Sequence, residues 1–92
     1  MSALFRLYVA GSAPNSLTAR SAIDRLRSSL APEAREAFEV EIIDVFESPD
    51  RAAEDGILVT PTLVRVAPEP RRTLVGSLSD GDRLRALLEE RP

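Results

Sequence analysis

The sequence contains no cysteine, no histidine, no tryptophan and no lysine in its 92 residues. The absence of cysteine and histidine excludes disulfides, thiolate nucleophiles and ordinary zinc sites, together with Ser-His-Asp and Cys-His catalytic machinery. Without lysine the chain can form no Schiff base and carries no Walker motif. We therefore expect no cofactor and no metal. The remaining polar chemistry belongs to carboxylates, hydroxyls and arginines.

All 12 basic residues are arginines, and with 15 acidic residues they give a net charge of −3. This balance disfavours a general nucleic-acid-binding protein, which usually carries basic charge over the whole domain. No apolar run approaches the roughly 18 residues of a membrane span, and residues 1–6 lack the pattern of an export signal. The length and the 43% apolar content suit a single domain over residues 1–92. We expect a cytoplasmic protein with no membrane or nucleic-acid partner.

The first half of the chain predicts two strands joined by a helix. Residues 4–10 are apolar on both alternating faces apart from Arg6, which is typical of a central strand covered by helices on both sides. From Pro14, apolar residues at helical spacing predict a helix closing near residues 31–32, with a loop or fraying turn up to residue 37. Residues 38–46 predict a second strand, parallel to the first because a helical crossover joins them.

The second half predicts a short helix, a hairpin and a final helix from turn, strand and helix-start signals. The expected elements are a helix that Ser48 caps and Gly56 closes, a strand over residues 62–66, a turn over 67–70, a returning strand over 71–76, and a final helix that Ser79 caps and that carries a leucine stripe at Leu84, Leu87 and Leu88. The first strand of the hairpin cannot extend back through Pro61 without losing a ladder donor.

The resulting order, βαβαββα, is that of an α/β thioredoxin-like domain with a mixed sheet. In that fold a proline, commonly in cis, precedes the third strand, and Pro61 stands at the matching place. Thioredoxins carry a Cys-x-x-Cys pair at the junction of the first strand and first helix. The same junction here, residues 10–16, contains no cysteine, which excludes dithiol exchange.

Several strings of residues closely resemble the KaiB family of bacterial clock proteins, in the same order and spacing over nearly the whole chain. They are Leu7-Tyr8-Val9-Ala10-Gly11, Pro14-Asn15-Ser16, Ile43-Asp44-Val45, the stretch from Ala53 to Leu63, and Arg71-Arg72 with Gly76-Ser77-Leu78-Ser79-Asp80. The strings over residues 8–11 and 57–63 are the most specific. The proline turn before Arg71 is slightly shorter than in the family.

The resemblance implies a non-enzymatic adaptor that docks on the N-terminal ring of a KaiC-like hexameric ATPase and influences its phosphorylation cycle, in a clock, timer or stress response. It allows further partners, namely a KaiA-like protein, a sensor histidine kinase whose thioredoxin-like domain competes for the same ring, and a second copy of the chain in a dimer or tetramer. Several members also have a resting fold with a rearranged C-terminal half. As the sequence ends at residue 92 without a kinase region, we expect the stand-alone form.

Arg65, Arg71 and Arg72 are the candidate partner-binding residues, because they fall where the family shows basic residues needed for docking. A hairpin would bring Arg65 near the other two, and their guanidiniums could pair with carboxylates across an interface. The alternative is solubilising charge that keeps an edge hairpin from pairing with other strands. Another basic position of the family, early in the first helix, is occupied by Thr18 here.

Four residues bear on folding and on fold switching. Tyr8 is expected to be a core aromatic with its hydroxyl at the rim. Pro61, Pro68 and Pro70 follow bonds that isomerise slowly, which would gate a change between two folds that differ in proline geometry. The final helix consists mostly of strong helix formers and has no glycine beyond its start. We therefore expect the chain to prefer the thioredoxin-like form.

Two other functions remain as alternatives to the adaptor. A thioredoxin-fold transferase or reductase would use Ser12, Ser16 or Tyr8, although no base can be identified nearby. A generic interaction module outside any clock is the other. Glu41 and Asp44 do not suggest paired catalytic carboxylates, because a three-residue separation places them on opposite faces of a strand.

Overall fold

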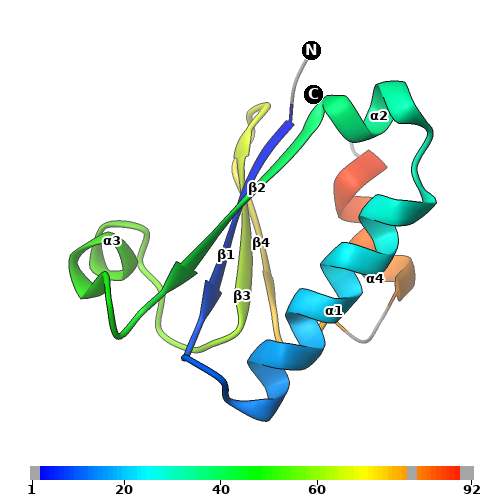
Figure 1. The fold of residues 1–92 in the computed structure, drawn as a ribbon. Helices are drawn as coiled ribbons and strands as arrows, with labels where there is room; N and C mark the ends of the chain where they lie inside the picture. Colours follow the sequence, from blue (N-terminus) through cyan, green and yellow to red (C-terminus); the bar gives the residue numbers. More distant parts are fainter. Residues whose placement is uncertain (1–2, 79–80, 90–92) are drawn as a thin grey trace.

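A four-stranded mixed sheet with helices on both of its faces forms the fold (Figure 1). The computed structural model describes residues 3–78 and 81–89. In chain order the elements are β1 (Ala3–Val9), α1 (Pro14–Ser29), α2 (Pro32–Glu36), β2 (Phe38–Asp44), α3 (Pro49–Glu54), β3 (Thr62–Ala67), β4 (Arg72–Val75) and α4 (Gly81–Glu89).

The strands lie in the order β2-β1-β3-β4, so β1 is an inner strand and β2 and β4 are the edges. β1 runs parallel to β2, with Arg6 opposite Glu41, and antiparallel to β3, which in turn pairs antiparallel with β4. The predicted crossover and hairpin are thereby confirmed, as is the thioredoxin-like α/β fold with a mixed sheet.

The two faces of the sheet bury two separate apolar clusters. α1 and α4 cover one face and α3 covers part of the other (Figure 1). Because side chains alternate along a strand, β1 sends Phe5, Leu7 and Val9 into the larger cluster, with α1 and α4, and Tyr8 into the smaller one beneath α3. The even-numbered face of β1 therefore carries the residues that must meet α3.

Several element ends differ from the expected ones. Residues 32–36 form a separate short helix rather than a loop, because Leu30 and Ala31 are extended and Pro32 restarts the helix at the position where its fixed φ fits. β2 ends at Asp44 rather than at residue 46, since the Asp44 carboxylate accepts a hydrogen bond from the Phe46 N–H at 2.9 Å and starts a turn. Ser48 precedes α3 as predicted but makes no side-chain cap.

The proline and final-helix predictions concern the C-terminal half. The peptide bonds before Pro61, Pro68 and Pro70 are all cis. In α4, Leu84 and Leu87 are buried in the larger cluster, as the predicted stripe requires. Ser79 and the side chain of Leu88 lie outside the described residues.

The larger cluster makes Leu26 a test of the packing of α1. We expect Leu26→Ala to lower the free energy of unfolding by about 2 to 5 kcal/mol, because it removes buried methyl groups and leaves a cavity. Leu17→Ala on the same helix is the matched control, since Leu17 is 48% exposed. Urea unfolding of the two variants would contradict this packing if they lost stability equally.

Candidate functional site

The three candidate arginines lie close together along the backbone of the β3–β4 hairpin, but their side chains occupy different environments. The backbone prediction is confirmed, because Arg65 pairs directly with Arg72 across the two strands. Arg65, however, is only 1% exposed. Its guanidinium donates to the backbone carbonyls of Pro70 at 2.6 Å and Leu87 at 3.5 Å.

Arg65 is therefore an interior residue, and the expectation that it shares an exposed basic surface with Arg71 and Arg72 is wrong. Its charge lies against a carbonyl in the last turn of α4, where the helix dipole favours a cation, and so it fastens that helix to the hairpin. A signal was present in the sequence: Arg65 falls on the same strand face as the buried Leu63.

Arg71 and Arg72 are both exposed but belong to opposite faces of the sheet. Arg72 lies opposite Arg65, so its side chain leaves the backbone on the α4 side. Arg71 instead reaches beneath α3, where its Nη2 lies 3.1 Å from a carboxylate oxygen of Asp55 and donates to the Asp55 backbone carbonyl at 3.1 Å. The two neighbouring arginines consequently offer charge in different directions.

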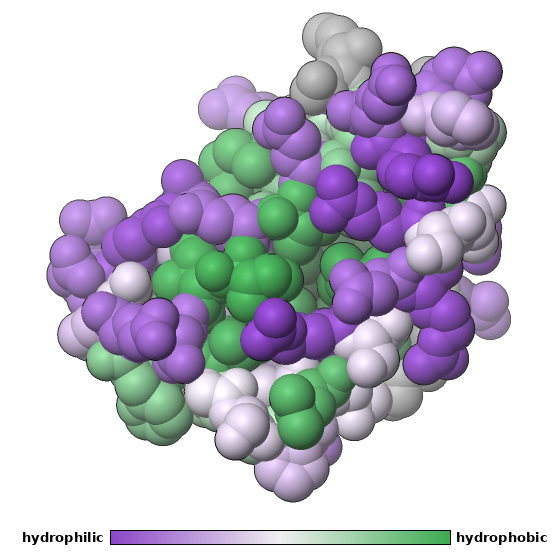
Figure 2. Space-filling model, in the orientation of Figure 1, coloured by the Kyte–Doolittle hydropathy of each residue, from purple (hydrophilic) through white to green (hydrophobic). Residues whose placement is uncertain are grey.

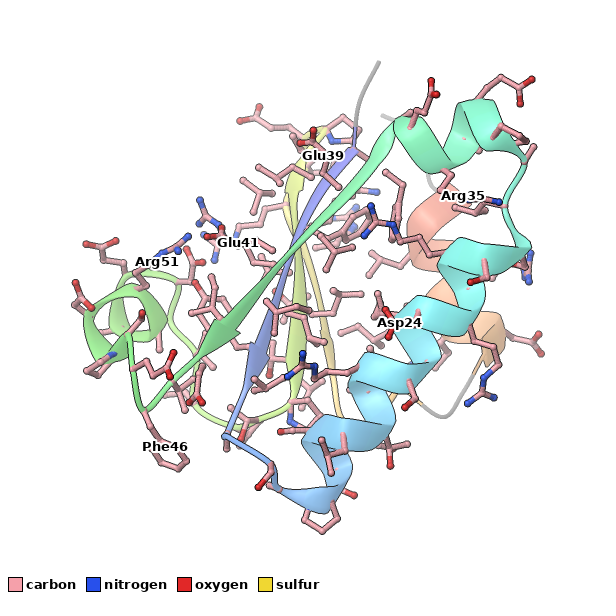
Figure 3. The ribbon with its side chains drawn as sticks, viewed as in Figure 1. Asp24, Arg35, Glu39, Glu41, Phe46 and Arg51 are labelled. Atoms are coloured by element: carbon pink, nitrogen blue, oxygen red, sulfur yellow. The ribbon has the colours of Figure 1, made fainter. Side chains whose placement is uncertain are left out.

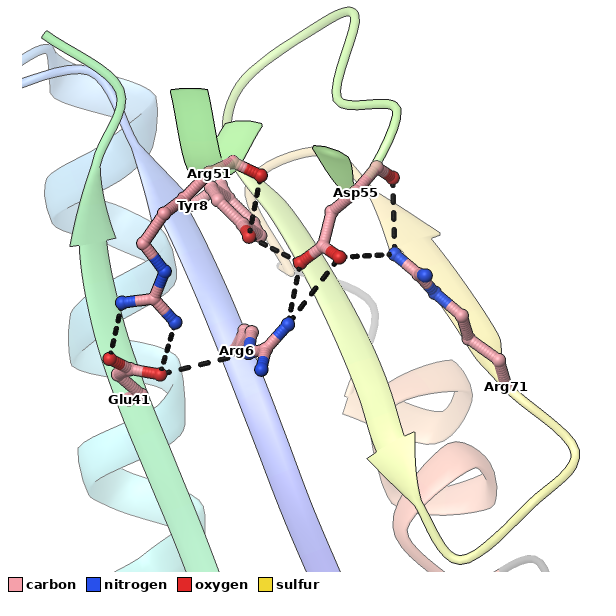
Figure 4. A network of polar contacts seen from close by, with 6 residues as sticks. All are labelled: Arg6, Tyr8, Glu41, Arg51, Asp55 and Arg71. Carbon is pink, nitrogen blue, oxygen red and sulfur yellow. Dashed lines mark hydrogen bonds and ion pairs between the residues drawn. The ribbon is translucent and has the colours of Figure 1, made fainter. Parts of the chain in front are cut away.

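Asp55, the residue after α3, is the centre of a polar network that links three parts of the chain (Figure 4). Its carboxylate accepts a hydrogen bond from the Tyr8 hydroxyl and another from Arg6 Nη1 at 3.0 Å, both from β1, in addition to the ion pair with Arg71. Its side chain is 9% exposed. One largely buried carboxylate thus ties β1, the end of α3 and the start of β4 together.

A second pair extends this network to the edge strand. The guanidinium of Arg51, on α3, donates to both carboxylate oxygens of Glu41, on β2, at 2.6 and 2.8 Å. Arg6 Nε lies 3.7 Å from the same carboxylate, so Arg6 links the Glu41 carboxylate to that of Asp55. This fork is more exposed than the Asp55 contacts, so solvent screens it more strongly.

Burial and hydrogen bonding set the protonation states in the network. Burial alone would raise the pKa of Asp55, but the hydrogen bonds from Tyr8 and Arg6 and the charges of Arg71 and Arg6 outweigh it and hold that pKa below 3.8. Burial, and then the hydrogen bond and charge of Asp55, raise the pKa of Tyr8 to about 12. The hydrogen bonds from Arg51 lower the pKa of Glu41. At neutral pH the carboxylates are charged and Tyr8 is neutral.

The sequence prediction of Tyr8 as a core aromatic is confirmed, since it lies in the smaller cluster with its hydroxyl directed to Asp55. The roles of Arg6, Asp55 and Arg51 were missed. Arg6 was visible as the single charge in an apolar strand, where a charge that is even partly withdrawn from water needs a partner. No comparable signal distinguishes Asp55, because its partners lie far along the chain.

The end of the sheet where β1 and β2 finish is apolar. Phe46 points away from the sheet at the turn after β2 (Figure 3), and Leu58, Val59 and Val75 are also more than half exposed. Figure 2 shows further apolar surface between α1 and α3, over the edge strand β2, on which Ile42 is partly exposed. Sequence reasoning did not single out this surface.

Of the hydroxyls considered for an enzyme, only Ser12 is exposed. Ser16 is buried and its Oγ accepts a hydrogen bond from the Ala10 N–H at 3.0 Å, while Tyr8 is held by Asp55. A depression of about 300 Å³ lies elsewhere, lined by Asp24, Arg27, Ser28 and Arg35. In the described part of the chain no three side chains gather to hold a metal, and no helix has the length and apolarity that crossing a membrane demands.

The strand order, the proline before β3 and the cysteine-free junction after β1 together define a thioredoxin-like protein without the redox pair. The N-terminal domain of Synechococcus elongatus SasA has this fold, with a TM-score of 0.75 at 24% identity over 100% of this chain and 89% of that one. A Halobacterium salinarum thioredoxin variant gives a TM-score of 0.77 at 25% identity, over 96% of this chain and 73% of that one.

The family model of the KaiB domain matches residues 6–90, and the chain belongs to the KaiB family. It is 43% identical over 81 residues to the circadian clock oscillator protein KaiB of Parasynechococcus marenigrum, covering 88% of this chain and 75% of that protein. The protein of the same name from a Prochlorococcus marinus strain is also 43% identical over 81 residues, with 88% of this chain and 66% of that protein covered. The family and fold that the sequence strings indicated are thereby confirmed.

Tyr8 reports directly on the network, because it is the only tyrosine and the chain has no tryptophan. We expect its tyrosinate absorbance to appear with a midpoint at about pH 12 in the folded protein, against the ordinary 10.0. Asp55→Asn should lower that midpoint, since it removes a negative charge, but leave it above the ordinary value because burial is the largest cause. A midpoint unchanged by Asp55→Asn would contradict the contact.

Asp55 should also make stability depend on acid pH. Its pKa is lowered by folding, so its contribution is present above the unfolded-state pKa of about 3.8 and is lost as the pH falls through the folded-state value. We expect the difference in unfolding free energy between wild type and Asp55→Asn, about 1 to 3 kcal/mol at pH 7, to shrink on acidification. Glu54→Gln, on the exposed side of α3, should show little difference at either pH.

Proposed function

We propose that this chain is a non-enzymatic KaiB-type adaptor that binds the N-terminal ring of a KaiC-like hexameric ATPase and modulates its phosphorylation and ATPase cycle. Membership of the KaiB family over residues 6–90 is the observation that carries the proposal. The names of the relatives, circadian clock oscillator proteins, support a role in a clock or timer. A KaiA-like protein or a sensor histidine kinase would be further partners.

The contact surface that we propose is the hairpin edge of the sheet, which Arg71 and Arg72 flank from its two faces. Both are exposed arginines, and a guanidinium can pair with a carboxylate through two parallel hydrogen bonds. Arg65 would act indirectly, because its buried guanidinium fastens the hairpin and α4 to each other. Docking would therefore use two of the three arginines of the sequence prediction.

The enzyme alternative has less support. A transferase or reductase of this fold would need an activating group at the start of α1. The candidate hydroxyls there are either already hydrogen-bonded within the fold or have no base beside them in the part of the chain that the structure describes. Ser16 is buried and its hydroxyl is used as a hydrogen-bond acceptor. Ser12 is exposed in the turn after Gly11, and it does not line the depression found among the described residues.

Arg72→Glu is the sharpest test of this surface. Arg71→Glu would place a second carboxylate beside Asp55 and so confuse loss of binding with loss of fold. We expect Arg72→Glu to weaken binding to the purified ATPase ring by about tenfold, since it replaces an attraction by a repulsion. Arg25→Glu, an equal charge change on the exposed face of α1, is the matched control.

Binding should be measured by calorimetry or mass photometry with ATP, and with a non-hydrolysable analogue, on a purified KaiC-like hexameric ATPase. Circular dichroism would establish that both variants remain folded. If Arg72→Glu and Arg25→Glu lose the same affinity, the effect comes from overall surface charge and not from a contact at the hairpin. If the wild-type chain fails to bind the ring with either nucleotide, the adaptor function itself is wrong.

A further inference from the structure

Arg71, one of the two proposed docking residues, is already engaged within the free chain. Its Nη2 is shared between the carboxylate and the backbone carbonyl of Asp55, each at 3.1 Å. Its side chain is nevertheless 48% exposed, whereas that of Asp55 is 9% exposed. The guanidinium therefore presents its remaining N–H donors to solvent while an internal carboxylate holds one nitrogen.

The charges around Asp55 do not need Arg71 for balance. Arg6 and the Tyr8 hydroxyl already engage the carboxylate from β1, and Arg51 engages Glu41. Among the residues drawn in Figure 4, three guanidiniums face two carboxylates. The network thus keeps one positive charge in surplus, and Arg71 is its most exposed cation.

We propose that Asp55 is an internal competitor for Arg71 and that it limits the affinity of the hairpin for carboxylates on a partner surface. This inference rests on the proposed function, in which Arg71 meets an acidic surface of the ATPase ring. A carboxylate approaching Arg71 is attracted by the guanidinium and repelled by Asp55, which lies only 3.1 Å behind it. The internal pair therefore cancels part of the attraction that would bring the partner in.

Asparagine at position 55 separates this competition from a purely structural role. Its amide has nearly the shape of the carboxylate and keeps one oxygen that can accept a hydrogen bond from Arg71. The substitution lowers stability, because Arg6 loses the nearer of its two carboxylate partners. A merely structural role would then weaken docking, whereas the competition raises the affinity.

We expect Asp55→Asn to bind the purified ATPase ring about twofold to fivefold more tightly than wild type, the range of a partly exposed ion pair. The gain should disappear when Asp55→Asn is combined with Arg71→Gln, which by itself weakens binding. Glu54→Gln removes the same charge from the neighbouring residue, which no described contact joins to Arg71, and should change the affinity little. All variants are compared at a temperature where circular dichroism shows them folded.

Three outcomes would overturn the proposal: weaker or unchanged binding by Asp55→Asn, an equal gain from Glu54→Gln, or a gain that survives Arg71→Gln. The first would leave Asp55 a structural residue alone. The second would attribute the effect to net charge. The third would place it at a residue other than Arg71.

A second measurement does not require the ring. Citrate, a small tricarboxylate, is titrated while the Arg71 Nε–Hε signal is followed by NMR. We expect the Asp55→Asn signal to respond at a lower citrate concentration than the signals of wild type and Glu54→Gln. Failure of the wild-type chain to bind the ring would contradict the adaptor function. Equal citrate responses in wild type, Asp55→Asn and Glu54→Gln would contradict the competition between Asp55 and a partner carboxylate.

Discussion

β1 sends two polar side chains, Arg6 and Tyr8, into the region beneath α3, and a guanidinium taken out of water is costly unless a carboxylate meets it. Asp55 meets both, from a position 49 residues further along the chain than Arg6. Because a charged group that loses its hydrogen-bond partner in a largely buried region costs about 1 to 3 kcal/mol, this requirement holds the end of α3 against the central strand. The start of β4 is drawn to the same place through Arg71.

The hairpin arginines show that the same residue type serves different purposes within one hairpin. Arg65 is an internal fastening between the sheet and α4, Arg71 is shared between the interior and solvent, and Arg72 is exposed on the other face. Arginine suits all three positions, because its planar fork carries five N–H donors that can meet backbone carbonyls as well as carboxylates. A count of basic residues on the hairpin therefore overstates the charge that a partner can meet.

The junction where thioredoxins hold their cysteine pair has taken on a structural role here. Gly11 adopts a φ of +52°, which favours glycine, and the Ser16 hydroxyl accepts the Ala10 N–H. Around this end of the sheet, exposed apolar side chains such as Phe46 and Leu58 replace reactive groups. The scaffold is thioredoxin-like, and the polar contacts of this chain lie beneath α3 and at the hairpin instead of at the junction.

Periodicity and turn residues were enough to predict the strands, the long helix and the crossover, since each depends on neighbours in the chain. They were insufficient at α2, where Pro32 restarts a helix that local composition had presented as a loop. The site was only partly predictable. The family strings placed Arg71 and Arg72 on a hairpin, whereas nothing in the spacing joined Arg6 to Asp55 or turned Arg65 inward.

The sequence by itself determined the absent chemistry, the alternation of β1 and the place of the hairpin, because composition and local pattern decide these. Only the tertiary structure decided which charges are buried and which remain available. Charges separated by tens of residues meet when strands and helices pack, and their energy depends on distance and burial, neither of which a linear pattern records.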